Sequence, residues 1–153
     1  MDESLRELYQ EVIIDHGRHP RNFTKLKDYN RCLEGYNPLC GDRVELYLLV
    51  KNNKVINASF QGEGCAISIA SASLMIELIK GKSVEESRQL FQEFHDLITQ
   101  QSPPITTLDN LGKLCALGGV SEFPSRVKCA TLAWHILNTA LRDKDTSETV
   151  TTE

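Results

Sequence analysis

The sequence lacks any long hydrophobic run. Its longest uninterrupted apolar stretch is Leu46–Val50, whereas a helix that spans a bilayer needs roughly 20 apolar residues. The first residues, Met1 to Arg6, begin with acidic side chains and lead into an amphipathic pattern, which differs from the basic segment and apolar block of a secretory signal. We therefore expect no membrane segment and no membrane binding, and we expect a cytoplasmic location.

The chain also lacks a concentration of Lys and Arg. Its 17 basic residues are scattered, and 21 acidic residues bring the formal net charge to -4. Domains that bind nucleic acids usually carry a basic patch or stripe. The composition therefore predicts that no nucleic acid is a partner.

Cysteine pairs with the spacing of a zinc finger are missing, because the sequence contains no Cys-x-x-Cys motif. The 5 cysteines are odd in number and widely separated, and a chain of 153 residues can bury a sufficient core without disulfides. This usage is typical of a reducing compartment, in which cysteines serve metal binding or thiol chemistry.

Three cysteines and one aspartate stand where loops meet regular elements. Cys40 and Asp42 flank Gly41 just before an expected strand, and alternate residues of extended backbone project to the same face. Cys65 opens a long apolar helical stretch, and Cys129 lies in the first turns of another. The three cysteines are expected at exposed element ends, where a helix N-terminus favours the thiolate. Together, the four side chains are candidates for one metal site.

Each candidate also has a purely structural interpretation. Asp42 can act as a turn residue that bonds nearby amides, and Cys65 can simply pack beneath the glycine turn at 62–64. Cys32 and Cys115 are interpreted as small buried hydrophobic residues. The four histidines are remote from the candidate cysteines in sequence and are interpreted as solvated or helix-capping side chains. They are His16, His19, His95 and His135.

Hydrophobic periodicity predicts an α+β fold in which a small antiparallel sheet packs against helices. Residues 43–51 alternate as a strand does, and Asn52-Asn53 provides a two-residue turn into a returning strand at 55–60. Helices are expected at 5–17, 66–80, 83–98, 108–117 and 125–141, with a further strand at 32–36. Residues 1–142 are expected to form a single domain, and the polar residues 143–153 are predicted to form a disordered tail.

Three motifs carry the cysteines. They are Pro38-Leu39-Cys40-Gly41-Asp42, Gly62-Glu63-Gly64-Cys65-Ala66-Ile67-Ser68 and Arg126-Val127-Lys128-Cys129-Ala130-Thr131-Leu132. In order and in sequence they resemble the motifs of the SufU family, the IscU-like branch of iron–sulfur cluster assembly proteins, and the similarity extends from residue 15 to residue 134. The resemblance implies an IscU-like α+β fold, a cytoplasmic location, a cysteine desulfurase of the SufS type as partner, and downstream Suf cluster-assembly proteins.

The chain departs from IscU itself next to the third cysteine. IscU scaffolds have a histidine there, whereas this sequence has Lys128, whose protonated amine cannot replace a neutral imidazole as a ligand near pH 7. The connection at 100–123 is longer than in IscU, and Phe123-Pro124-Ser125-Arg126 stands in place of the chaperone-binding motif. These departures are similar to SufU and favour sulfur transfer over direct cluster assembly.

The resemblance implies a zinc site and a reactive thiol. The expected Zn²⁺ ligands are Cys40, Asp42, Cys65 and Cys129. Three thiolates and a carboxylate can close a tetrahedral site, whose negative charge Arg126 or Lys128 can offset. Cys40 is expected to be the catalytic residue that accepts persulfide sulfur. The alternative is a scaffold that assembles a [2Fe–2S] cluster, or holds iron, on the same four residues. A third interpretation is a structural zinc domain that binds a partner protein.

Overall fold

The computed structural model describes residues 3–99, 110–142 and 149–151. The elements are α1 (Glu3–Arg18), β1 (Arg31–Asn37), β2 (Asp42–Lys51), β3 (Lys54–Glu63), α2 (Ala66–Ile79), α3 (Val84–Ile98), the 3₁₀ helix η1 (Gly112–Glu122), α5 (Pro124–Arg142) and β4 (Thr149–Thr151). The strands lie in the order β3-β2-β1-β4. Neighbouring strands among β1, β2 and β3 are antiparallel, and β4 runs parallel to β1.

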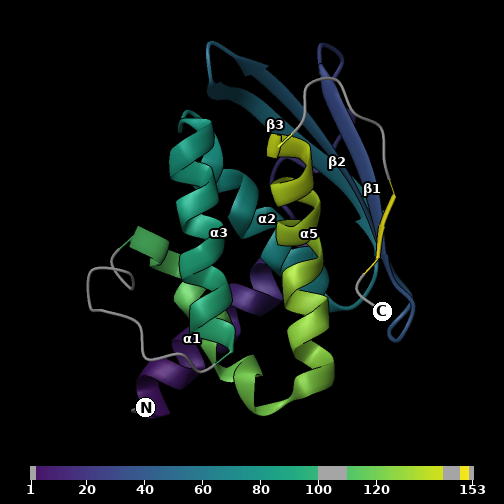
Figure 1. Ribbon diagram of the computed structural model, residues 1–153. Helices are drawn as coiled ribbons and strands as arrows, with labels where there is room; N and C mark the ends of the chain where they lie inside the picture. Colours follow the sequence, from purple (N-terminus) through teal and green to yellow (C-terminus); the bar gives the residue numbers. More distant parts are fainter. Residues whose placement is uncertain (1–2, 100–109, 143–148, 152–153) are drawn as a thin grey trace.

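Helices cover one face of the sheet (Figure 1). α2 packs against β3 and α5 packs against β1 and β2, while α1 and α3 contact these two helices from outside. Trp134 of α5 and Phe94 of α3 are fully buried, and their rings stack with centroids 4.9 Å apart. The predicted α+β class, with an antiparallel sheet packed against helices, is confirmed.

The β2–β3 hairpin forms as its sequence predicts. Val44, Leu46 and Leu48 are buried at alternate positions of β2, as expected for a strand whose one face packs on the core. Asn52 and Asn53 have φ angles of 52° and 63°, which the two-residue turn requires and asparagine tolerates. The hairpin therefore fixes the register that places Asp42 at one end of β2, opposite the end of β3.

α2 has buried side chains on all sides, also as predicted, because α1, α5 and the sheet surround it. The hydroxyl of Ser71 donates to the main-chain oxygen of Ala130 on α5 at 2.6 Å, whereas the buried hydroxyl of Ser68 has no hydrogen-bond partner among the described residues. The predicted capping box before α3 is present, with Ser83 and Glu86 each bonding the other's main-chain amide. The start of α3 is thus fixed by the residues that the sequence singles out.

His16 differs from the sequence prediction, since it is buried with 1% exposure and not solvated. Its Nδ1 lies 2.8 Å from the hydroxyl of Ser73, which also accepts the main-chain N–H of Arg21. Burial holds the pKa of His16 below its usual range, because the charged imidazolium would lose its hydration. His16 therefore joins α1 to α2. The prediction of a solvated side chain holds for His19, which is exposed.

Two further expectations are corrected or only partly covered by the structure. Residues 110–111 and η1 lie where a short helix at 108–117 is expected, and 108–109 lie outside the described residues. Thr149–Thr151 form strand β4 on the free edge of β1, although this segment is predicted to belong to a disordered tail. Its β-branched residues favour extended backbone, and β1 offers unpaired main-chain groups.

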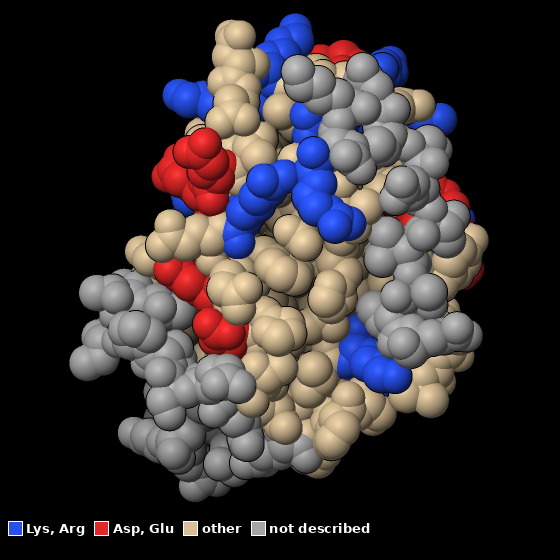
Figure 2. All heavy atoms as spheres, viewed as in Figure 1, with Lys and Arg blue, Asp and Glu red and all other residues tan. Residues whose placement is uncertain are grey.

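Charged side chains are unevenly spread over the face that carries α3 and α5. In Figure 2, the described Lys and Arg side chains form small groups there, separated by a broad uncharged surface.

No helix within the described ranges combines the length and the apolar character that crossing a bilayer requires.

The backbone of β2 leaves no room for a side chain at Gly62 of β3, and we predict that replacing Gly62 destabilises the fold. A Cβ added at Gly62 would lie 2.1 Å from the main-chain oxygen of Arg43, so Gly62→Ala should lower the free energy of unfolding by about 1–3 kcal/mol or more. Gly119→Ala is the matched control, because its added Cβ meets no atom within 4 Å. Urea denaturation of the metal-free protein measures both. Equal midpoints for the two variants would contradict the close approach.

Candidate metal centre

The β1–β2 turn, the loop before α2 and the start of α5 converge at the lower end of the sheet (Figure 1). There the possible ligand atoms of Cys40, Asp42 and Cys129 all lie within 4.8 Å of one another. Within the described ranges this is the only group of three or more His, Cys, Asp or Glu side chains with that spacing. Residues far apart in the sequence therefore form one compact donor set.

A tight turn places Cys40 beside Asp42 and Cys129. The main-chain oxygen of Asn37 accepts the N–H groups of Cys40 and Gly41, at 3.3 and 3.0 Å. Gly41 has a φ of 73°, in the left-handed region that favours glycine. The turn leaves the Cys40 side chain partly exposed. Its thiol is therefore the one in the group that a partner can reach.

Asp42 is nearly inaccessible, with 1% exposure. One carboxylate oxygen accepts the main-chain N–H of Cys65 at 2.9 Å, and the other accepts the side-chain amide of Asn37 at 3.1 Å. These two donors offset the cost of removing a carboxylate from water. Gly64 permits the approach, because a Cβ there would lie 2.4 Å from Oδ1 of Asp42.

Cys129 contradicts the prediction of an exposed thiol at a helix end. It lies beyond the first turn of α5 and is fully buried. Its Sγ lies 3.1 Å from Sγ of Cys40 and accepts the side-chain amide of Asn37 at 3.4 Å. Burial is the main cause that raises the pKa of Cys129 well above the ordinary thiol range, followed by its contacts with Cys40 and Asp42. The helix N-terminus does not outweigh this desolvation.

Cys65 stands at the edge of the group. It is the N-cap residue of α2, with extended backbone, and its main-chain amide binds Asp42 directly. Its thiol is not among the atoms that lie within 4.8 Å of one another, although it contributes to the raised pKa of Cys129. The structure thus brings three of the four expected ligands together and places the fourth beside them.

Arg126 supplies the positive charge that the sequence assigns to either Arg126 or Lys128. A hydrogen bond with Cys129 is the main cause that raises the pKa of its guanidinium, followed by the charges of Cys65, Cys129 and Cys40. Lys128 is exposed on α5. Of these two basic residues, Arg126 is therefore the one for which the structure records interactions with the thiols.

Asn37 is a site residue that sequence reasoning misses. It is fully buried and its amide touches both Asp42 and Cys129, while its main-chain oxygen holds the Cys40 turn. Its Oδ1 has no hydrogen-bond partner among the described residues. The available signal was an asparagine at the end of a strand, just before Pro38, and asparagine is common at turns for reasons unrelated to function.

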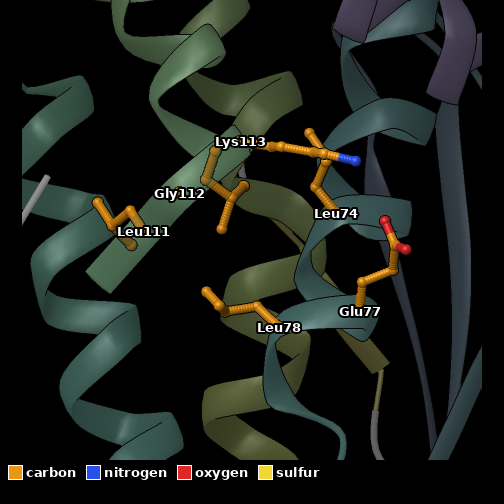
Figure 3. Close-up of a pocket in the computed structure, with 7 residues that line it drawn as sticks. Leu74, Glu77, Leu78, Leu111, Gly112 and Lys113 are labelled. Atoms are coloured by element: carbon orange, nitrogen blue, oxygen red, sulfur yellow. The ribbon is translucent and has the colours of Figure 1, made fainter. Parts of the chain in front are cut away.

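Several hollows lie on the described surface, and two of them are relevant to the candidate ligands. An open depression of about 440 Å³ adjoins the donor group and is lined by Tyr36, Asn37, Pro38, Gly41, Asp42, Arg43 and Glu63. A smaller hollow of about 220 Å³ lies between α2 and η1, and its lining includes Leu74, Leu78 and Leu111 as well as the charged Glu77 and Lys113 (Figure 3). None of its lining residues is a candidate ligand. The first hollow is therefore the one that gives access to the candidate centre.

The donor set fits a borderline or soft metal. Thiolates and a carboxylate are ligands of zinc and of protein-bound iron, whereas hard cations such as Mg²⁺ prefer oxygen alone. The buried Cys129 and Asp42 form a rigid inner side and the partly exposed Cys40 an accessible outer side. Such a site can hold a metal and still present one reactive thiol.

The two remaining cysteines lie outside this group. Cys32 on β1 and Cys115 in η1 are partly exposed, which corrects the prediction that both are buried. Cys115 packs against the core. Cys32 pairs with Tyr47 across the sheet, and burial together with the charge of Glu45 raises the pKa of its thiol. Neither belongs to the donor set.

Comparison with known proteins agrees with this geometry. The model of the NifU-like N terminal domain matches residues 8–143. The chain belongs to this family. The matched region includes all three cysteine motifs and reaches from α1 to just beyond the end of α5.

Individual relatives cover most of the chain. The zinc-dependent sulfurtransferase SufU of Bacillus subtilis is 43% identical over 88% of this chain and 89% of its own. The iron–sulfur cluster assembly scaffold protein IscU of Streptococcus pyogenes is 37% identical over 90% of this chain and 85% of its own. The crystal structure of SufU from Fervidobacterium islandicum, described as an iron–sulfur cluster assembly scaffold protein for the SUF system, has a TM-score of 0.81 and 33% identity, and covers 89% of this chain and 98% of that one. The expected membership in the SufU and IscU-like group is confirmed.

We predict that Asn37 stabilises the metal-free site. Asn37→Ala removes a donor from the buried Asp42 carboxylate and should lower the free energy of unfolding by about 1–3 kcal/mol. Asn37→Asp should cost more at neutral pH, because it places two carboxylates side by side. Asn57→Ala is the control, since that side chain bonds only its neighbour Ala58 in the structure. Urea denaturation with chelator present measures all three; a cost for Asn37→Asp below that for Asn37→Ala would contradict the assignment.

Proposed function

We propose that this protein is a zinc-dependent sulfur-transfer protein. It accepts persulfide sulfur from a cysteine desulfurase for iron–sulfur cluster biogenesis in the cytoplasm. The observation that carries the proposal is the donor group itself, in which one accessible thiol, Cys40, lies against the buried Cys129 and Asp42. The name of the Bacillus subtilis relative supports the same assignment.

The proposed zinc ligands are Cys40, Asp42, Cys65 and Cys129. The ligand atoms of Cys40, Asp42 and Cys129 already lie within 4.8 Å of one another. Cys65 adjoins them, because its main-chain N–H donates a hydrogen bond to Asp42. Bound zinc would keep the thiols deprotonated and protect them from oxidation. Asp42 is the hardest ligand of the set and the one that tunes release.

Cys40 carries the proposed chemistry. Once released from the ligand set, its thiolate attacks the outer sulfur of the desulfurase persulfide, the bond between the two desulfurase sulfurs breaks, and the desulfurase cysteine leaves as thiolate. Cys40 then holds the persulfide for the downstream Suf proteins. Arg126, which interacts with the thiols, offsets the negative charge.

A docking surface for the desulfurase is available beside Cys40. Leu39 is 64% exposed and Phe123 is 59% exposed, and they directly precede Cys40 and α5. Large apolar side chains that remain in water next to a functional group are typical of protein contact sites. We assign these two residues to the surface that meets the desulfurase of the SufS type.

A scaffold that assembles a [2Fe–2S] cluster is the second candidate. It uses the same four residues, and the relative from Streptococcus pyogenes is named a scaffold protein. Lys128 weighs against it, because the exposed lysine stands where IscU scaffolds have a histidine. Brown colour and acid-labile sulfide after anaerobic reconstitution would favour this candidate.

The first test measures cysteine turnover by the cognate desulfurase. The reaction is compared without addition, with zinc-loaded protein, and with its Cys40→Ala and Cys32→Ser variants. We expect the zinc-loaded protein and Cys32→Ser to accelerate turnover and to gain a persulfide, and Cys40→Ala to do neither, because only Cys40 presents the accepting thiol. If the zinc-loaded protein is inert and only the metal-free or iron-loaded protein responds, the scaffold candidate replaces sulfur transfer.

Asp42→Ala tests the ligand assignment. The variant should fold, but its zinc affinity should fall by more than the roughly 10–100-fold that loss of an outer hydrogen-bond partner causes. Glu63→Ala is the control, because Glu63 lines the same depression while its side chain is 78% exposed. Competition with a chromophoric chelator measures both affinities, and circular dichroism checks the fold. Equal affinities would remove Asp42 from the ligand set.

A further inference from the structure

Cys129 lies directly behind the thiol that is proposed to carry sulfur. Its Sγ is 3.1 Å from Sγ of Cys40, and its S–H donates toward that atom. Cys129 is fully buried, whereas Cys40 is partly exposed. The two sulfurs therefore lie at different depths, with the partly exposed thiol of Cys40 outside and the buried thiol of Cys129 inside.

This arrangement determines where the outer sulfur of a Cys40 persulfide can lie. The inner side of Cys40 is occupied by Cys129, so the added sulfur must point toward the exposed side. Cys129 then faces the inner sulfur on the side opposite to the added one, which is the alignment for displacement at a disulfide-type bond. The side-chain amide of Asn37, 3.4 Å from Sγ of Cys129, can stabilise the attacking sulfur.

We propose that, when no metal holds its thiols, this protein converts its own persulfide into hydrogen sulfide. Cys129 attacks Sγ of Cys40, a Cys40–Cys129 disulfide forms, and the bond to the outer sulfur breaks. The proton of Cys129 goes to the leaving sulfur, so that one persulfide and one thiol give one disulfide and one H₂S. The outer sulfur gains two electrons and the two cysteine sulfurs supply them, so no external oxidant takes part.

Metal occupancy then decides the fate of the sulfur. When Cys129 is a metal ligand its lone pair is engaged, and the Cys40 persulfide survives for transfer to another protein. When the metal is absent, the same persulfide ends as sulfide and the protein as a disulfide, which a dithiol reductant must open before the next cycle. The inference rests on the proposed function, because it requires Cys40 to carry persulfide sulfur.

The test follows the persulfide under anaerobic conditions after loading and removal of excess donor. Metal-free protein is loaded in two ways, with desulfurase plus cysteine and with inorganic polysulfide. We expect loss of the added sulfur atom by intact mass, release of sulfide in equal amount, and a Cys40–Cys129 disulfide by peptide mapping. The zinc-loaded protein should keep its persulfide over the same time.

Two cysteine variants distinguish the contribution of Cys129 from that of a cysteine outside the donor group. Cys129→Ser should keep the persulfide and release no sulfide, because a hydroxyl cannot replace the attacking thiol. Cys32→Ser should behave like the unmodified chain, since Cys32 lies outside the donor group. Peptide mapping of the unmodified chain gives the answer even if a variant at the buried Cys129 fails to fold.

Several results would overturn the inference: a persulfide that is stable on metal-free protein, a disulfide that joins Cys40 to Cys65, or equal sulfide release from Cys129→Ser. In another outcome, the desulfurase delivers no sulfur while the polysulfide-loaded chain still forms the Cys40–Cys129 disulfide and sulfide. That result would refute the proposed sulfur transfer from a desulfurase and would support the present inference. If Cys40 takes up sulfur from neither donor, both fail.

Discussion

The buried carboxylate of Asp42 constrains everything around it. A carboxylate with 1% exposure costs several kcal/mol unless donors replace its water, and here the donors come from the start of α2 and the end of β1. Satisfying one side chain therefore brings two separate segments to the first residue of β2. Asn37 extends the same network to Cys129 on α5. The position of the thiols follows from the need to satisfy this carboxylate.

Much of this arrangement could be predicted from the sequence, because its signals are local. The alternating residues of β2 and the Ser83 capping box each act within a few positions, and both form as predicted. The three cysteine motifs identify the family and the candidate ligands. Pairing of Thr149–Thr151 with β1 could not be predicted, because it depends on an edge formed by residues more than a hundred positions earlier.

The burial of each cysteine side chain was the other property that could not be predicted from the sequence. Helical periodicity places Cys129 near the start of α5, but its burial depends on how α5 lies across β1 and β2. The same packing gives the two neighbouring thiols different roles. Cys40, in a turn, is partly exposed to solvent, while Cys129 is shielded and its pKa is raised by burial. Asn37 was missed for a related reason, since its two contacts exist only after β1 and α5 have packed together.

The donor atoms alone do not distinguish sulfur transfer from cluster assembly, since zinc and cluster iron both accept thiolates and a carboxylate. The surrounding charge is more informative. Arg126, and not an imidazole, interacts with the thiols, and a guanidinium cannot act as a metal ligand because it has no lone pair to offer. It can, however, stabilise anions, and both the thiolate of Cys40 and its persulfide are anions. An exposed guanidinium in that position is better suited to stabilising anionic sulfur than to adding another ligand to a cluster.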